Sequence, residues 1–227
     1  MSQQDQKERV GKAAADFVES GMTLGLGTGS TAACFIQALA ERGLRPRCVA
    51  TSEATAVMAL GLGFDIVGLD VLSKVDLTVD GVDEVDANLT AIKGGGGALM
   101  REKIVASISE TVVYIGDDTK LVDRLGKFPL PIEVSPFASS VVLRKISDLG
   151  AKSEIRLQNG KPFVSDEGHW IIDAAFEVIE DPYELDVLLN MTPGVVAHGL
   201  FIDLIDRMLL MQNGDVVALD QIGRAHV

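Results

Sequence analysis

The sequence predicts an α/β protein built from an open, doubly wound parallel sheet and a second, smaller domain of the α+β type. Two observations predict this fold. Through the first half of the chain, short apolar runs alternate with amphipathic helical segments, as expected of parallel strands joined by crossover helices. After Pro129 and Pro131 the expected order becomes strand, helix, strand, strand, helix, strand, which is the ferredoxin-like order.

Helices and strands are expected to alternate from the start of the chain. Val10, Ala14 and Phe17 share one face of the first helix. A strand and a glycine loop follow, and Ser30 and Thr31 are expected to cap the second helix. The expected helices of this half cover residues 6–19, 31–42, 53–62 and 98–109, and the strands cover 22–26, 47–51, 65–69, 76–79 and 111–115.

The second half is expected to form the smaller domain and then to return to the first. Helices are expected at 138–149 and 182–189 within the segment 132–201. Two last strands, 207–211 and 215–219, flank Asn213-Gly214, which is a strong hairpin signal. We therefore divide the chain into a first domain of residues 1–127 plus 204–227 and a second domain of residues 128–203.

The composition fits a folded enzyme and limits its partners. Of 227 residues, 47% are hydrophobic and only 5% aromatic, so the core must be aliphatic. The formal net charge of −13 makes nucleic acid a poor partner, because a phosphate backbone requires a basic surface. A small phosphate ester remains compatible, since the amides of one helix N-terminus and one or two lysines form a local positive site.

Cysteine content and hydropathy indicate the cellular compartment of the protein. Cys34 and Cys48 are too few for a disulfide framework, which favours a reducing compartment and hence the cytoplasm. The polar N-terminal segment lacks the apolar stretch of a signal peptide, and no apolar run approaches the length that spans a bilayer. We expect a soluble protein that does not act at a membrane.

The glycine-rich segment 25–31, with the sequence GLGTGST, is a candidate phosphate loop. It lies between an expected strand and an expected helix, where glycines let the backbone approach a ligand. It has no lysine before the Ser/Thr pair, as a Walker loop would, and it lacks the full dinucleotide fingerprint. A tight turn with an ordinary helix cap is the alternative interpretation.

A second group of polar residues follows the strand 76–79. Asp80, Asp83 and Glu84 share one short turn, and Lys93 precedes the four glycines 94–97. A glycine run is costly in backbone entropy, which suggests that a ligand approaches the backbone closely there. A solvated acidic turn and a flexible linker are the alternatives.

These residues match what enolisation of a sugar requires. A carboxylate must accept a proton from carbon, and a cation or preorganised amides must stabilise the enediolate. We assign Glu102 as the base, with Lys93 and the glycine amides as stabilisers. Asp80, Asp83 and Glu102 would also suit a Mg²⁺ or Mn²⁺ site, but the ammonium of Lys93 already compensates their charge, so we expect no metal.

The motifs resemble those of the type A ribose-5-phosphate isomerases. They are GLGTGST at 25–31, DGVDE at 80–84, KGGGGAL at 93–99 with REKI at 101–104, and DDTK at 117–120. The similarity continues through KFPLPIEV at 127–134 to TPGVVAHGLF at 192–201, so it covers nearly the whole chain. Residues 221–227 match no feature of the family, and we assign them no role.

The resemblance implies a Rossmann-like domain with a smaller α+β domain, in a homodimer or a dimer of dimers. It implies interconversion of D-ribose 5-phosphate and D-ribulose 5-phosphate, a step of the pentose phosphate pathway, through an enediol without a cofactor. Glu102 matches the proton acceptor, Lys93 is kept as a stabiliser, and Asp80, ahead of Asp83, is the first choice for assisting ring opening. The matched substrate-binding residues are Thr28, Gly29, Ser30, Thr31, Asp80, Gly81, Val82, Asp83, Lys93, Gly94, Gly95, Gly96 and Lys120, with Lys7 as a further phosphate contact.

Two other classes of protein share this style of sheet and loop. One is a sugar-phosphate-sensing domain of a transcription regulator, which would bind a sugar phosphate and leave it unchanged. The chain lacks an accompanying helix-turn-helix and keeps Glu102 and Lys93, which binding alone would not need. The other class comprises acyl-CoA transferases and glucosamine-6-phosphate deaminases, and nothing beyond shared architecture points to a CoA ester or an amino sugar.

Overall fold

A computed structural model describes residues 1–221, and residues 222–227 lie outside the described part. Its largest sheet has seven strands in the order β16-β15-β7-β4-β1-β2-β3. All neighbouring strands run parallel except the last pair, β15 and β16. The strands are β1 (Thr23–Leu26), β2 (Arg47–Ala50), β3 (Asp65–Ile66), β4 (Val75–Gly81), β7 (Ser109–Gly116), β15 (Arg207–Gln212) and β16 (Asp215–Asp220).

Helices cover both faces of this sheet, as the sequence pattern predicts for a doubly wound fold. On β7, Val113 and Ile115 pack in the core under α1 and α2, whereas Val112 and Tyr114 face the opposite side, where Ala106 of α4 lies. This alternation is the two-residue period of a strand that is buried on both faces. The helices are α1 (Gln3–Ala15), α2 (Ser30–Glu41), α3 (Glu53–Gly61) and α4 (Leu99–Ser107).

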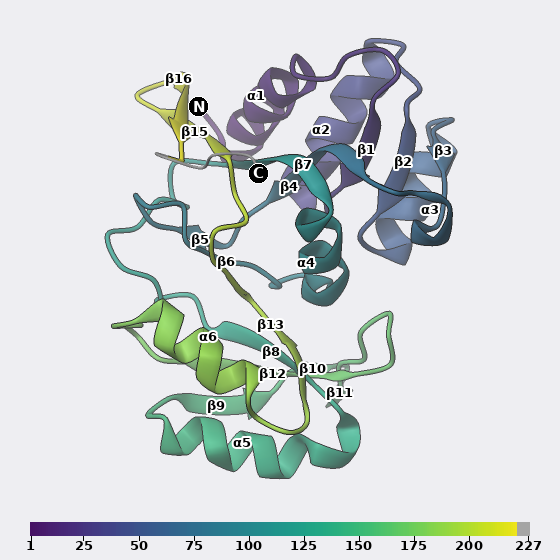
Figure 1. Ribbon diagram of the computed structural model, residues 1–227. Helices are drawn as coiled ribbons and strands as arrows, with labels where there is room; N and C mark the ends of the chain where they lie inside the picture. The colour runs from purple at the N-terminus through teal and green to yellow at the C-terminus, as the bar shows by residue number, and fades with distance from the viewer. Residues whose placement is uncertain (222–227) are drawn as a thin grey trace.

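The second large sheet lies below the first in Figure 1 and has the order β13-β8-β12-β9. Every neighbouring pair is antiparallel. Its four strands and two helices follow one another along the chain in the order expected for a ferredoxin-like unit. Two helices pack in one core cluster with this sheet. The elements are β8 (Leu130–Val134), α5 (Ser139–Asp148), β9 (Lys152–Ile155), β12 (Trp170–Ala175), α6 (Pro182–Asn190) and β13 (Val195–His198).

Several short elements were not predicted from the sequence. A three-stranded sheet in the order β14-β6-β5 lies between the two large sheets in Figure 1. Its strand β5 begins at the end of the acidic turn, and its strand β6 ends directly before Lys93. The short elements are β5 (Glu84–Val85), β6 (Ala91–Ile92), β10 (Leu157–Gln158), β11 (Lys161–Pro162), β14 (Leu200–Phe201) and the 3₁₀ turns at Leu69–Val71 and Pro136–Ala138.

Most expected elements are present, but the first two helices start differently and the expected strand 65–69 extends only over Asp65–Ile66. The first helix begins at Gln3 instead of residue 6, because Ser2 and Asp5 form a capping box. The expected cap of the second helix is wrong: Gly29 occupies the N-cap position with φ 108°, and Ser30 is already helical. No helix among residues 1–221 is long and apolar enough to cross a membrane.

Candidate active site

A cavity of about 160 Å³ opens where the carboxyl ends of β1 and β4 meet the glycine run. In parallel α/β sheets, ligands bind at this edge. All of the residues predicted for the site line the cavity except Asp80, which lies behind its wall and is 1% exposed. The lining consists of Lys7, Thr28, Gly29, Ser30, Thr31, Gly81, Val82, Asp83, Lys93, Gly94, Gly95, Gly96, Glu102 and Lys120.

One end of the cavity is suited to an anion. The helix α2 begins there at Gly29 with no side chain capping its first amides, so its positive end faces the cavity. Lys7 reaches across from α1, and its Nζ donates to Ser30 Oγ at 3.0 Å. Lys120, which follows β7, adds a second ammonium to the lining. Helix amides with two lysines nearby are chemically suited to hold an anion such as a phosphate.

Behind the lining at this end, Thr28 contacts a buried cluster of hydroxyl groups. Thr28 Oγ1 donates to Ser52 Oγ at 2.9 Å and lies 2.7 Å from Thr51 Oγ1 and 3.2 Å from Thr55 Oγ1. Thr51, Ser52 and Thr55 are not among the site residues predicted from the sequence. Thr51 ends the predicted strand 47–51, and Ser52 and Thr55 follow within the next four residues; this position was the signal that could have identified them, because strand ends meet at the ligand edge.

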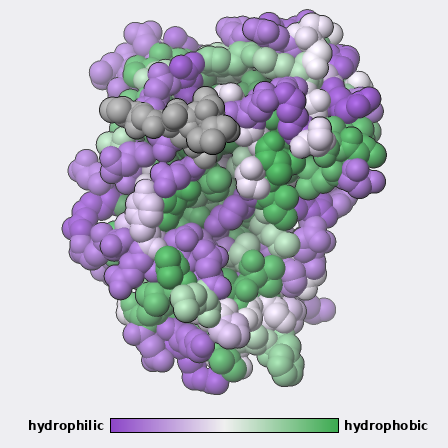
Figure 2. Space-filling model, in the orientation of Figure 1, coloured by the Kyte–Doolittle hydropathy of each residue, from purple (hydrophilic) through white to green (hydrophobic). Residues whose placement is uncertain are grey.

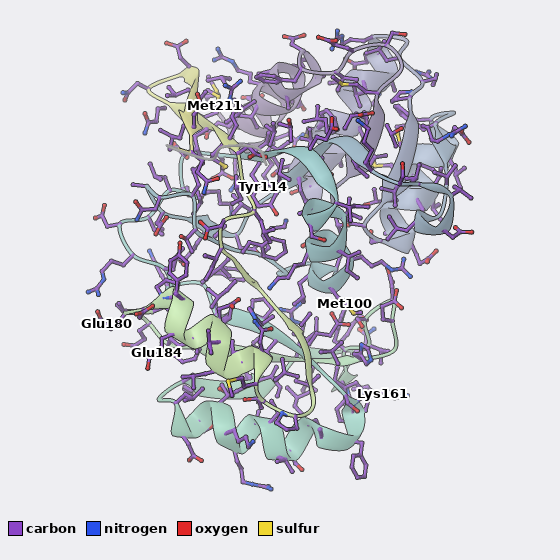
Figure 3. All side chains as sticks on the ribbon, viewed as in Figure 1. Met100, Tyr114, Lys161, Glu180, Glu184 and Met211 are labelled. Atoms are coloured by element: carbon purple, nitrogen blue, oxygen red, sulfur yellow. The ribbon has the colours of Figure 1, made fainter. Side chains whose placement is uncertain are left out.

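In the cavity wall, the buried ammonium of Lys93 is shared by two buried carboxylates, one of which lines the cavity while the other lies behind it. Lys93 Nζ lies 2.9 Å from Asp80 Oδ2 and 3.4 Å from Glu102 Oε2, and it donates to the carbonyl of Gly81 at 2.5 Å. The ring of Tyr114, which is labelled in Figure 3, lies 4.8 Å from the same nitrogen. A buried charge is stable only when it is paired and hydrogen-bonded, and Lys93 meets both conditions.

The surroundings shift the pKa values of this cluster. Burial raises the pKa of Glu102 to about 8; the charge of Asp80 adds to the rise and Lys93 opposes it. Burial also raises the pKa of Asp80, against the effect of Lys93. For Lys93, burial favours the neutral amine, but the two carboxylates outweigh burial and raise its pKa. A carboxylate with a pKa near neutrality is suited to accept and return a proton.

The glycine run forms another part of the cavity wall. Gly94 and Gly97 have φ values of 102° and 83°, which side chains rarely tolerate. The amide of Gly95 donates to Asp83 Oδ2 at 2.8 Å, and a Cβ on Gly95 would lie 2.8 Å from Asp83 Oδ1. Both the conformation and the close approach therefore require glycine here.

The histidines lie elsewhere. His169 Nδ1 is 3.1 Å from Glu133, and the fully buried His198 has its Nε2 3.2 Å from Asp186. His226 falls outside the described residues.

Comparisons with known proteins agree with this fold. The family model of ribose 5-phosphate isomerase A (phosphoriboisomerase A) matches residues 47–215. The chain is 50% identical over 215 residues to ribose-5-phosphate isomerase A of Sphingopyxis alaskensis, which covers 93% of this chain and 94% of the relative. It is 50% identical over 213 residues to the protein of that name from Sinorhizobium medicae, covering 90% and 92%.

Solved structures give the same result. A D-ribose-5-phosphate isomerase in complex with phospho-erythronic acid superposes with a TM-score of 0.94 at 39% identity, covering 97% of this chain and all of that one. Ribose 5-phosphate isomerase A of Methanocaldococcus jannaschii superposes with a TM-score of 0.91 at 40% identity, covering 96% and 100%.

The fold, the buried acid–base cluster and these relatives together define an enzyme of the isomerase class. Within that class, the chain belongs to the ribose 5-phosphate isomerase A family, which confirms the resemblance of its motifs.

Proposed function

We propose that the protein interconverts D-ribose 5-phosphate and D-ribulose 5-phosphate through an enediol, with Glu102 as the general base. The observation that carries this proposal is the position of Glu102: it lines the cavity, is 4% exposed, and lies 3.4 Å from Lys93. A buried carboxylate beside an ammonium can take up a proton from carbon and return it. We infer the substrate from the relatives, which are named as ribose-5-phosphate isomerases.

The anionic end of the substrate belongs at the start of α2. There Lys7, Lys120 and the first amides of the helix would hold the phosphate, as such groups hold anions generally. Holding the phosphate at this end places the opposite end of a five-carbon chain toward Glu102 and the glycine run. The reacting carbons are then oriented by contacts that are made away from them.

The isomerisation needs one base and an oxyanion site. Glu102 removes the proton from C2 of the open-chain aldose, the C1–C2 double bond forms, and O1 takes up the negative charge and then a proton. Glu102 returns its proton to C1 while the hydroxyl at C2 releases its own proton to solvent, which balances the solvent proton taken up by O1, and becomes the ketone. Lys93 and the amides of the glycine run stabilise the charged oxygens during these steps.

Asp83 is better placed than Asp80 to assist ring opening. Asp83 lines the cavity, whereas Asp80 is buried behind Lys93 and accepts hydrogen bonds from the amides of Thr28 and Gly81. We therefore propose that Asp83 exchanges a proton with the ring oxygen or the anomeric hydroxyl. Asp80 then holds Lys93 and the phosphate loop in place.

The test is ribulose 5-phosphate formation from ribose 5-phosphate in excess EDTA, comparing the native chain with Glu102→Gln. We expect native turnover to persist and the variant to lose about 10²-fold or more in kcat, the range of general-base catalysis. Glu19→Gln, at an exposed position, is the matched control and should turn over like the native chain. Binding of ribose 5-phosphate without native turnover would instead favour the sugar-phosphate sensor, and EDTA-sensitive turnover would favour a metal.

We also propose that the protein self-associates as a homodimer or a dimer of dimers in the cytoplasm. The outer side of α6 supports self-association, because Tyr183, Val187 and Met191 there are 55%, 53% and 75% exposed. Hydrophobic groups gather over this helix in the lower half of Figure 2. The free thiols of Cys34 and Cys48 fit a reducing compartment. Sedimentation at several concentrations tests the oligomer; a monomer throughout contradicts it.

A further inference from the structure

Arg156 connects the four-stranded sheet to the glycine run of the site. It directly follows β9, and its guanidinium pairs with the carboxylate of Asp173 on the neighbouring strand β12. Arg156 Nε donates to Asp173 Oδ2 at 2.8 Å, and Nη2 donates to Oδ1. Such a two-point pair fixes the plane of the guanidinium, which a lysine could not do. The side chain is 15% exposed.

The remaining nitrogen of the guanidinium holds two carbonyls of the glycine run. Arg156 Nη1 donates to the carbonyl of Gly94 at 3.0 Å and to that of Gly95 at 3.1 Å. The amide of Gly95 donates to Asp83 Oδ2 on the opposite side. The peptide group between Gly94 and Gly95 is thus held at both ends, by Arg156 and by Asp83.

The next peptide group determines where an unused amide points. Because a trans peptide directs its carbonyl and its N–H in opposite directions, fixing the Gly95 carbonyl on Arg156 turns the Gly96 N–H away from Arg156. Gly96 lines the cavity and is exposed, and no acceptor within residues 1–221 takes its N–H. This amide is left available to an oxygen of the substrate.

A second contact supports the same arrangement. The ring of Phe163 lies 5.7 Å from the Arg156 guanidinium carbon, and a Cβ on Gly97 would lie 2.5 Å from that ring. Phe163 therefore packs directly against the last glycine of the run. The guanidinium and the ring restrain the run from the side opposite the cavity.

We propose that Arg156, oriented by Asp173, is a positioning residue for the isomerisation: it holds the glycine run so that the Gly96 amide can stabilise the oxyanion of the enediolate. Arg156 is not among the residues that line the cavity, so its effect passes through the backbone. The inference rests on the proposed isomerase function. It adds that the four-stranded sheet contributes to the reaction by orienting the backbone of the glycine run.

The test compares kcat and KM of the native chain with those of Arg156→Gln, Arg156→Lys and Asp173→Asn. An oxyanion donor acts in the transition state, so we expect kcat of Arg156→Gln to fall about 10²-fold with KM changed less than about threefold. Arg156→Lys should recover little, and Asp173→Asn should lose about tenfold in kcat. Arg124→Gln, at an exposed arginine paired with Glu180, is the matched control.

Chemical rescue separates positioning from loss of folding. Millimolar guanidinium added to Arg156→Gly should restore part of kcat, whereas equal ionic strength from sodium chloride should not. Native kcat in a folded Arg156→Gln variant would overturn the inference while leaving the isomerase function intact. Absence of turnover in the native chain would instead refute the proposed function itself. If Arg156→Gln does not fold, Asp173→Asn decides the question, because a native kcat there also overturns the inference.

Discussion

At the scale of single residues, the ionisation of Glu102 sets a pH dependence. Its pKa is raised to about 8, and only the ionised carboxylate can accept a proton. We expect kcat/KM for ribose 5-phosphate to rise about tenfold per pH unit below that value and to level off above it. Rates measured from pH 5.5 to 9.5 test this, with the residual rate of Glu102→Gln as the control that should lack the rise. A flat native profile contradicts it.

The residue types near the cavity were largely predictable from the sequence, whereas how deeply each side chain is buried was not. Asp83 follows the predicted strand 76–79, Lys93 precedes the glycine run, and Glu102 lies in the first turns of the predicted helix 98–109, so each was predicted near the ligand edge of a parallel sheet. That Asp80 lies behind the wall depends on its close approach to Lys93 and Thr28, which no local pattern encodes. Arg156 was missed because its partners in the glycine run lie 61 and 62 positions away in the chain.

At the scale of elements, the turn from β1 into α2 tolerates glycine only. A Cβ on Gly27 would lie 2.1 Å from Asp80 Oδ1 and 2.5 Å from Asp80 Cα, so backbone would have to move. We expect Gly27→Ala to lower both the unfolding midpoint and kcat. Gly61→Ala is the matched control: nothing lies within 4 Å of its added methyl, and it sits at the end of α3. The control should keep native activity and gain a few tenths of a kcal/mol or more in stability.

The elements that the sequence predicted are those with a strong periodic pattern. Long strands such as β7 and the hairpin of β15 and β16 were found, the latter from Asn213-Gly214, whose φ values of 51° and 91° suit a tight turn. The strands β5, β6 and β14 have two residues each, too few to show a period. They form only because distant segments bring them together, as when the Lys93 amide donates to the Gly199 carbonyl.

At the scale of the whole molecule, the three-stranded sheet joins the cores of the two large sheets: Ala91 and Phe201 pack in one buried cluster with Val112 of β7, and their neighbours Ile92 and Leu200 pack in the other. Ile92, Leu125 and Leu200 lie outside the four-stranded sheet but belong to the same buried cluster as Leu130 and Ile172 within it. Because these residues come from both parts, the division into residues 1–127 plus 204–227 and residues 128–203 stays a prediction about how the chain is arranged, and it does not imply that the two parts fold separately. A shared core favours joint unfolding.

We expect one cooperative unfolding transition. Trp170 on β12 is the single tryptophan, so its fluorescence reports the four-stranded sheet, whereas circular dichroism reports all elements. The two thermal curves should coincide. Leu125→Ala should lower both midpoints together, with a loss of about 2–5 kcal/mol typical of a buried leucine. Separate midpoints for the two signals would show that the parts unfold independently.

The place of β15 in the sheet has a consequence for synthesis on the ribosome. β15 pairs with β7, although the whole four-stranded sheet is translated between them. Until β15 emerges, the nascent chain exposes the open edge of β7 and the apolar positions that Met208 and Leu209 will cover. Unpaired edges of this kind are sites of aggregation. We expect general chaperones that bind extended apolar segments to contact the growing chain there, and to be released when the final hairpin closes the edge.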